Sequence, residues 1–151
     1  MSVTVRPGRP DEPAGRALLR ESQAYLDARY PPEDNHFLSI EELCAPHVRF
    51  FIAEAGGRPC GCGALAVTGD WGEVKSLYVD PAARGAGAGA ALMARIEAEA
   101  RALGLGAMRL ETGDDLYPAH RLYRRHGFVT CGPFGAYAEG PHSVFMEKRL
   151  D

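Results

Sequence analysis

Residues 77–89 read Leu-Tyr-Val-Asp-Pro-Ala-Ala-Arg-Gly-Ala-Gly-Ala-Gly and decide how the rest of the chain is interpreted. They join a segment with strand character (72–79) to an Ala-rich segment (88–103) whose apolar residues recur at helical spacing. Asp80-Pro81 turns the chain out of the strand. The glycine-rich loop therefore connects a strand to a helix, and a further strand at 107–112 completes a right-handed crossover between parallel strands.

The sequence before this stretch predicts an antiparallel meander. After a first strand, two helices are expected: one from Asp11 to about Arg29 and a short capped one at 39–43. Short Gly turns separate the strands that follow, and neighbouring strands joined in this way run antiparallel. The strands expected up to the loop are 2–6, 48–54, 60–67 and 72–79.

The sequence after the crossover predicts one more helix and two more strands. Asp114 or Asp115 is expected to cap a helix that ends at Gly127 and turns Tyr123 inward. The last strands, 128–131 and 143–150, are separated by a Gly/Pro-rich loop. The prediction is one α/β (α+β) domain over residues 1–151, with a mixed, mostly antiparallel sheet of about seven strands and helices on both faces.

Composition narrows the classes of function. The 151 residues are 46% hydrophobic and 25% charged, as in an average globular domain. A net charge of −3 and scattered arginines argue against a nucleic-acid partner. No apolar stretch has the length of a membrane span, and residues 1–10 lack the apolar core of a signal peptide. We expect a cytoplasmic protein with no membrane partner, and the sequence leaves a homodimer open.

Cys60-Gly-Cys62 is the one pairing of cysteines that could suggest a metal site. No second pair stands at zinc spacing, so no metal is expected. Residues two apart on a strand share a face, so we expect two small buried side chains on one side of the sheet.

The glycine loop is predicted to hold a pyrophosphate. Three alternating glycines allow close approach of the backbone, and the helix N-terminus behind them favours an anion. Arg84 adds a positive charge beside the loop. The residues expected to bind the anion are Arg84, Gly85, Ala86, Gly87, Ala88, Gly89 and Ala90.

Two alternatives to this interpretation remain open. The loop could be a flexible turn without function, although alternating glycines would then cost entropy without benefit. Gly85-x-Gly87-x-x-Ala90 also fits the dinucleotide fingerprint, with Glu111 about twenty residues further on. Against the dinucleotide fold, residues 80–84 separate strand from glycines, and only one crossover is present.

Two motifs resemble one family. Arg84-x-x-Gly87-x-Gly89 is similar to the R/Q-x-x-G-x-G/A signature of the GCN5-related N-acetyltransferases (GNAT), and 77–81 is similar to the strand exit before it. Leu122-Tyr123-x-x-x-Gly127-Phe128 resembles the second recurring element of that family. The order of the expected elements agrees with the family over essentially the whole chain.

The resemblance implies a cofactor and where it binds. The fourth and fifth strands should splay, and the pantetheine arm of acetyl-CoA should bond to the backbone near Leu77 and Val79. A backbone N–H near Leu77 or Tyr78 should bond the thioester carbonyl. Many members carry an Asn before the second element that contacts the cofactor; Leu116 stands there in this chain, so that contact is missing or is made by another residue.

Acetyl transfer also needs an acid and a base. A tyrosine, with a pKa of about 10, can protonate a departing thiolate whose thiol has a pKa of about 8.5, and the resemblance makes Tyr123 that acid rather than a core aromatic. Glu73 is the expected base; the alternative is a solvated strand-end carboxylate paired with Lys75. Further alternatives for the base are His120 and His126.

Direct attack by the amine in a ternary complex is preferred to a route through Cys131, because the sequence supplies no base to activate that thiol. The acceptor should be an amine of a small molecule or peptide. An acetyl-CoA sensor without turnover and a nicotinamide-dependent enzyme are the other classes considered.

The acceptor pocket should be built from segments 25–43 and 132–142, which combine aromatic and polar side chains. The acids Asp27, Glu33, Asp34 and Glu73 would tolerate a cationic amine. The other residues singled out are Tyr25, Tyr30, His36, Phe37, Phe134, Tyr137, Glu139 and His142.

Overall fold

A computed structural model describes residues 2–35 and 37–150 and places them around one seven-stranded sheet. The strands lie in the order β1-β2-β3-β4-β5-β7-β6. Their bounds are β1 Val3–Pro7, β2 Val48–Ala55, β3 Arg58–Thr68, β4 Trp71–Val79, β5 Ala107–Gly113, β6 Val129–Cys131 and β7 Ser143–Arg149. The helices are α1 Pro13–Arg29, α2 Ile40–Leu43, α3 Ala88–Ala102 and α4 Tyr117–Arg125, with 3-10 turns at Pro32–Asp34 and Pro81–Ala83.

Strands β2 to β4 form the predicted antiparallel meander, and β1 adds to it at the edge by pairing antiparallel with β2. The crossover through α3 then makes β4 and β5 parallel, as the sequence predicted. A mixed, mostly antiparallel sheet with helices on both faces is confirmed, and a dinucleotide-type parallel sheet is excluded.

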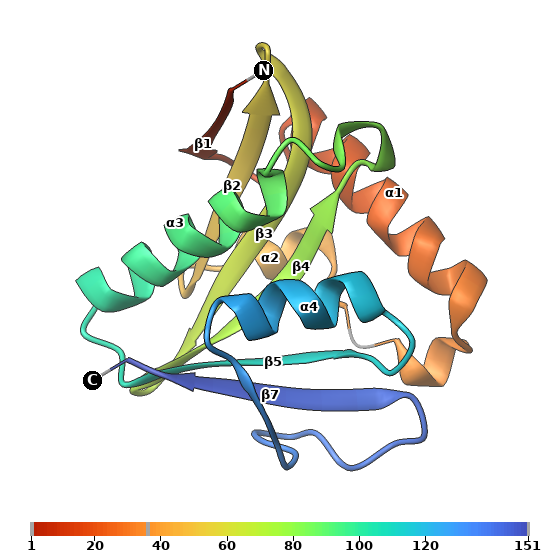
Figure 1. Cartoon of the computed structure of the whole chain (residues 1–151), viewed down its shortest axis with the longest axis vertical. Helices are drawn as coiled ribbons and strands as arrows, with labels where there is room; N and C mark the ends of the chain where they lie inside the picture. Colours follow the sequence, from red (N-terminus) through yellow and green to blue (C-terminus); the bar gives the residue numbers. More distant parts are fainter. Residues whose placement is uncertain (1, 36, 151) are drawn as a thin grey trace.

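The parallel pairing of β4 with β5 is short. It covers only Trp71–Glu73 against Ala107–Arg109, although β4 continues to Val79 and β5 to Gly113. Beyond Glu73 the two strands diverge, and α4 lies across the opening (Figure 1). The sheet is therefore splayed between its fourth and fifth strands.

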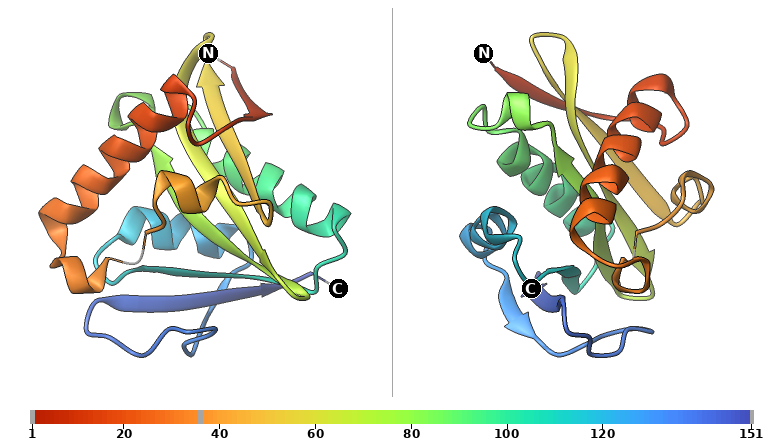
Figure 2. Two further views of the ribbon diagram at one scale, coloured as in Figure 1. Left: turned by 180° about the vertical axis from the view of Figure 1, so that it is seen from behind. Right: turned by 90° about the vertical axis from the view of Figure 1, so that its right-hand side faces the viewer.

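The two faces of the sheet are covered by different helices, as the view along the sheet shows (Figure 2). On one face Leu18, Leu19 and Leu43 of α1 and α2 pack against the side chains of β2 and β3. On the other, α3 and Tyr123 of α4 pack on the larger core. Both cores consist mainly of apolar side chains. Apolar residues recur at helical spacing in the sequence because they lie on the side of each helix that faces a core.

The two cysteines of β3 lie on opposite faces, which corrects the sequence prediction. Ala53 pairs with Gly61 and Glu54 with Pro59, so Cys60 is an extra residue in a β-bulge. The bulge reverses the alternation of side chains: Cys60 enters the α3-side core and Cys62 the α1-side core. The two thiols therefore cannot bind one metal ion together.

The helix ends differ from the prediction at two N-termini. The first helix was expected to be capped by Asp11, but Glu12 is the N-cap residue of α1 and makes no side-chain cap. Ser39 caps α2 through a capping box, as expected. Leu116, however, is the N-cap residue of α4 and makes no side-chain cap, so neither Asp114 nor Asp115 caps this helix. None of the helices formed by residues 2–35 and 37–150 combines the length and apolar composition that crossing a bilayer requires.

Candidate active site

A groove of about 480 Å³ runs along the opening of the sheet, between the end of β4, the glycine loop and α4. It brings together most of the residues predicted for the cofactor. Those lining it are Leu77, Tyr78, Val79, Arg84, Gly85, Gly87, Ala88, Gly89 and Ala90, with Tyr25, Leu116, Leu122, Tyr123 and Arg125 among the rest.

A β-bulge bends β4 where the groove begins. Cys62 pairs with Tyr78 and Ala64 with Lys75, so on β4 two residues stand opposite Gly63 alone. Ser76 takes a φ of 56°, in the left-handed region that residues other than glycine rarely adopt. The bulge lies past the last β4–β5 pair, so the main-chain groups of Leu77–Val79 that face β5 have no strand partner among the described residues.

The glycine loop offers free amides at the start of α3. Gly85 and Gly87 have φ of 90° and 87°, and Gly87 is the N-cap residue of the helix. The first-turn amides of Ala88, Gly89 and Ala90 have no carbonyl partner inside a helix. These amides and the positive end of the helix dipole form a site for an anion.

Two of the predicted amides are used elsewhere. The amide of Arg84 donates to the carbonyl of Pro81 at 3.3 Å, and that of Ala86 to the carbonyl of Ala83 at 3.2 Å. Ala86 also does not line the groove. These two amides therefore already have partners within the turn, while the exposed Arg84 side chain stands at the rim of the groove. Binding of the anion by residues 84–90 stays a prediction.

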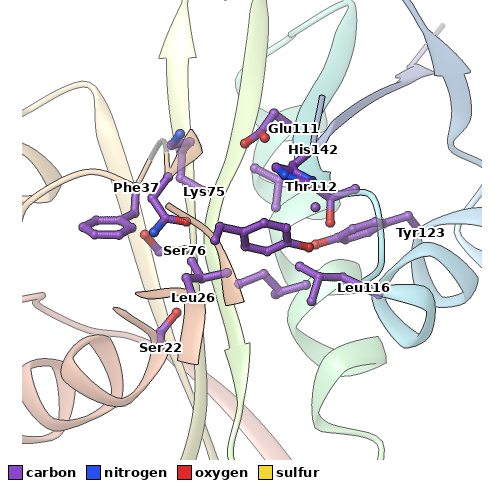
Figure 3. A pocket seen from close by; sticks show the side chains of 16 residues that line it. Ser22, Leu26, Phe37, Lys75, Ser76, Glu111, Thr112, Leu116, Tyr123 and His142 are labelled. Carbon is purple, nitrogen blue, oxygen red and sulfur yellow. The ribbon is translucent and has the colours of Figure 1, made fainter. Parts of the chain in front are cut away.

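A second cavity, of about 140 Å³, continues from the groove, and we call it the acceptor pocket. Tyr30, Phe37, Lys75, Glu111, Thr112 and His142 line it (Figure 3). The groove and the pocket adjoin at the splay, where they share Ser22, Leu26, Leu77, Leu116, Ala119 and Tyr123 as lining residues.

Tyr123 stands where the two cavities meet. Its side chain projects from α4 into the space between β4 and β5 (Figure 3), with its ring packed 6.0 Å from that of Phe128. Burial raises the pKa of Tyr123, and the nearby charge of Glu111 raises it further. The phenol therefore stays protonated at neutral pH, as an acid must be before it acts.

Glu73, the predicted base, lines neither cavity. Its carboxylate accepts a hydrogen bond from the Tyr137 hydroxyl at 2.5 Å and lies 3.4 Å from the Lys75 ammonium. Lys75 donates to the same hydroxyl at 2.8 Å. Burial and the bond to Glu73 raise the pKa of Tyr137. The sequence alternative of a Glu73–Lys75 pair is thus present, but the pair is largely buried rather than solvated.

Glu111 is a pocket residue whose role the sequence did not indicate. It was noticed only as the acidic partner of a dinucleotide fingerprint, whereas in the structure it faces the acceptor pocket and accepts a hydrogen bond from Ser143 at 2.9 Å. His142 lies beside it (Figure 3), with Nδ1 3.6 Å from Asp114. The sequence feature that could have indicated Glu111 is its place on the strand that follows the glycine loop and its helix.

The other residues considered for catalysis do not reach either cavity. The ring of His120 bonds the carbonyl of Gly113 at 2.7 Å. His126 ends α4, and burial lowers its pKa. Burial raises the pKa of Cys131, which opposes formation of a thiolate.

Only part of the predicted acceptor pocket is present. Tyr25 lines the groove instead, and the rings of Phe134 and Tyr137 pack on Phe145. Tyr30 holds the pocket wall by donating a hydrogen bond to Asp115. His36 and the side chain of Asp34 lie outside the described residues. Of the other residues predicted there, those that line neither cavity are Asp27, Glu33 and Glu139.

The groove fits coenzyme A on its own geometry. Unpaired strand groups at Leu77–Val79 can bond an extended amide-containing arm, and the helix amides at 88–90 can bond a pyrophosphate. A Cβ on Gly89 would stand 3.1 Å from Leu122, so glycine keeps α3 close to α4. Within the described residues no group of three or more His, Cys, Asp or Glu side chains could hold a metal ion.

Comparison with known proteins agrees with this geometry. The Acetyltransferase (GNAT) family matches residues 15–128. An IAA acetyltransferase of Azospirillum brasilense is 46% identical, covering 99% of both chains. An uncharacterized N-acetyltransferase, YsnE, of Bacillus subtilis is 36% identical over 93% of this chain and 97% of its own.

Solved structures share the fold. A Klebsiella pneumoniae protein assigned as an acyl-CoA N-acyltransferase superposes with a TM-score of 0.83 at 32% identity, over 99% of this chain and 98% of its own. PaiA N-acetyltransferase of Thermoplasma acidophilum, in complex with coenzyme A, has the same fold, with a TM-score of 0.75 at 19% identity, over 99% of this chain and 100% of its own. The chain belongs to the GNAT family of acetyltransferases.

Proposed function

We propose that the protein transfers the acetyl group of acetyl-CoA to an amine of a small molecule or peptide, by direct attack in a ternary complex. One observation carries the proposal. A groove along β4, whose main chain there has no strand partner among the described residues, meets at Tyr123 a separate pocket lined by polar and apolar side chains. Donor and acceptor can therefore occupy the protein together, which is the condition for direct attack.

The groove supplies the binding part of the mechanism. Bound acetyl-CoA would provide a thioester, whose carbonyl is attacked and whose sulfur leaves as a thiolate. The main chain of Leu77–Val79 would orient the arm, with an N–H of Leu77 or Tyr78 polarising the carbonyl. Gly85, Gly87 and the amides of 88–90 would hold the pyrophosphate, with Arg84 and Arg125 at the rim. Leu116 makes an apolar contact in place of the Asn of many members.

Tyr123 is proposed as the general acid. It borders both cavities, and its raised pKa keeps the proton available until charge develops on the sulfur. As the C–S bond breaks and the N–C bond forms, Tyr123 donates its proton to the sulfur. The amine loses one proton as it is acetylated. When that proton reaches Tyr123, it replaces the one given to the sulfur, and the reaction neither gains nor loses a proton overall.

For the base, the geometry favours Glu111 over Glu73. A base must come within hydrogen-bond reach of the amine, directly or through one water, and Glu111 faces the acceptor pocket while Glu73 does not. Glu111 and Tyr123 both line the acceptor pocket, so the proposed base and acid share one cavity. Glu111 would accept the proton of the amine and return it to Tyr123 after transfer.

A covalent acetyl-enzyme is not supported. No cysteine among the residues described lines either cavity, and burial raises the pKa of Cys60, Cys62 and Cys131. Thiols of this kind are poor nucleophiles. Initial rates at varied acetyl-CoA and amine should therefore give intersecting rather than parallel double-reciprocal lines.

The test of the proposal is thiol release from acetyl-CoA in the presence of amines, amino acids, polyamines and peptides. IAA belongs in the same screen, because the Azospirillum relative carries it in its name. Release of coenzyme A that depends on one acceptor class supports the proposal. Calorimetric binding of acetyl-CoA without turnover would instead favour a sensor, and binding of NAD alone would contradict the proposal.

A further inference from the structure

Opposite charges face one another at the point where the sheet opens. Glu73 of β4 is paired with Arg109 of β5, which is the last parallel pair. Two residues further along each strand, on the same faces, stand Lys75 and Glu111. Both line the acceptor pocket, one from each strand (Figure 3).

Lys75 is held as a buried cation at one side of the pocket. Only 8% of the residue is exposed, and its ammonium is fixed by the hydroxyl of Tyr137 at 2.8 Å and the carboxylate of Glu73 at 3.4 Å. A buried lysine is rare unless it is paired, and this pair anchors the ammonium in one place. An anion in the pocket would therefore meet a positioned charge without the cost of ordering a flexible side chain.

The remainder of the pocket is small and close to neutral. Apart from His142, whose charge depends on protonation, Lys75 and Glu111 are its two charged side chains among the described lining residues. The other lining side chains are apolar or uncharged, Leu26, Tyr30 and Phe37 among them. A volume of about 140 Å³ is close to that of cavities that hold one small ring, which suits a free small molecule.

We propose that the acceptor is a small amino acid-like zwitterion, whose carboxylate binds Lys75 and whose amine binds Glu111. This inference rests on the proposed function and names the substrate class of its acceptor pocket. Bound in this way, the amine lies on the Glu111 side, near Tyr123 at the junction with the groove. Glu111 binds the ammonium, which releases one proton to solvent to become the attacking amine, and Glu111 receives the second proton as the N–C bond forms. Leu26, Tyr30 and Phe37 contact an apolar side chain of the acceptor.

The experiment compares matched acceptors that differ only in the carboxylate. Leucine, leucinamide and 3-methylbutylamine form one series; phenylalanine, phenylalaninamide and 2-phenylethylamine form a second. Because the amide has the less basic amine, chemistry alone would favour it over the acid. We expect kcat/KM for the acids to exceed that for both analogues by about 10- to 100-fold, the range for a hydrogen bond to a charged group.

Variants of Lys75 test whether this residue causes the preference for acceptors that carry a carboxylate. In Lys75→Met the preference for acid over amide should fall to within about 3-fold, and Lys75→Arg should retain part of it. Lys148→Met is the matched control: it removes the other lysine of the chain, which bonds Glu97 at 2.7 Å and lines neither cavity. Its acid-to-amide ratio should equal that of the unaltered protein.

A binding measurement separates recognition from turnover. With coenzyme A present, calorimetry should show leucine or phenylalanine binding more tightly than its amide to the unaltered protein, and equally to Lys75→Met. If Lys75→Met does not fold, the comparison of acids with their amides and amines on the unaltered protein still tests whether the acceptor carboxylate is recognised. Equal or better use of the amides and plain amines overturns this inference while leaving acetyl transfer intact; no thiol release with any amine would overturn the proposed function itself.

Discussion

The coenzyme groove and the acceptor pocket share Tyr123 but are built in different ways. The groove is formed largely by main chain: the unpaired edge of β4 and the amides at the start of α3. The acceptor pocket is formed by side chains from distant elements, including α1, β4, β5 and the end of the loop before β7. Tyr123, in the wall that they share, is where we propose that acetyl transfer takes place.

The difference in construction has a consequence for specificity. Main-chain groups are the same whatever the side chains, so a main-chain groove can keep one ligand while the sequence around it changes. The side-chain pocket can be rebuilt by a few substitutions. We therefore expect changes in the groove to alter acetyl-CoA affinity and changes in the pocket to alter turnover or acceptor choice.

The strongest test of that division is Glu111→Gln in the pocket. We expect kcat/KM to fall by about 100-fold or more, because general acid–base groups contribute about 10²- to 10⁴-fold. Acetyl-CoA affinity, measured by calorimetry, should not change. Glu73→Gln is the comparison: it removes a charge that anchors Lys75 but no group that lines the pocket, so it should cost less in kcat/KM than Glu111→Gln. A larger loss from Glu73→Gln would return the role of base to Glu73.

Tyr123→Phe tests the shared wall. Loss of the hydroxyl should reduce kcat by about 10- to 100-fold, because the sulfur then has to leave without its acid. The ring and its packing on Phe128 are kept, so the acetyl-CoA dissociation constant should stay within about 2-fold. Unchanged kcat with a saturating acceptor would remove the acid role from Tyr123.

Gly87→Ala tests the groove. Gly87 has a φ of 87°, and the space that a Cβ would occupy is open, so alanine brings backbone strain of about 1–2 kcal/mol without a clash. A methyl group facing the pyrophosphate should also raise the acetyl-CoA dissociation constant about 10-fold and leave saturated kcat alone.

Gly57→Ala is the control for this change. Gly57 shares a positive φ of 79° and open surroundings, but it lies in the β2–β3 turn. Thermal unfolding should show a similar loss of stability in both variants, and calorimetry should show weaker acetyl-CoA binding only in Gly87→Ala. Equal acetyl-CoA affinity in the two variants would mean that Gly87 does not face the cofactor.

The smallest expected effect is an absence of alkaline inhibition. A general acid works in its protonated form, which is lost as pH rises through its pKa. Because burial raises the pKa of Tyr123 above the ordinary value of about 10, the acid form persists through that pH. With a saturating acceptor, kcat should stay level from about pH 8 to about pH 10. A decline with a midpoint below about pH 9 would contradict the raised pKa.

The sequence predicted the groove better than the pocket. Glycine spacing and helical periodicity are local, so they indicated the loop, α3 and the inward face of Tyr123. The bulge at Cys60 changed which core that side chain enters, and no local pattern signals an extra residue in one strand. Asp115 looked like a helix cap because its partner, Tyr30, is distant in sequence.

The choice between Glu73 and Glu111 shows, at the site, the same limit of local sequence patterns. Both are strand carboxylates, and periodicity alone could not tell which of them faces an opening. The choice depends on where β4 stops pairing with β5, which is a property of the whole sheet. It depends also on Tyr137, which arrives from the loop before β7 and draws Glu73 away from the cavity.

The three residue pairs that join β4 to β5 leave a short seam in the sheet, between the meander on one side and β5, β7 and β6 on the other. One apolar core nevertheless continues across the seam, from Leu92 and Ile96 of α3 to Met108 of β5 and Met146 of β7. Amide hydrogens of Leu77–Val79 that face the seam should exchange with solvent deuterium without any unfolding, whereas those between β2 and β3 require a much larger opening. A ligand bonded along this edge would extend the hydrogen bonding of β4 past its last pair with β5, so protection of these amides from exchange would report occupancy of the groove.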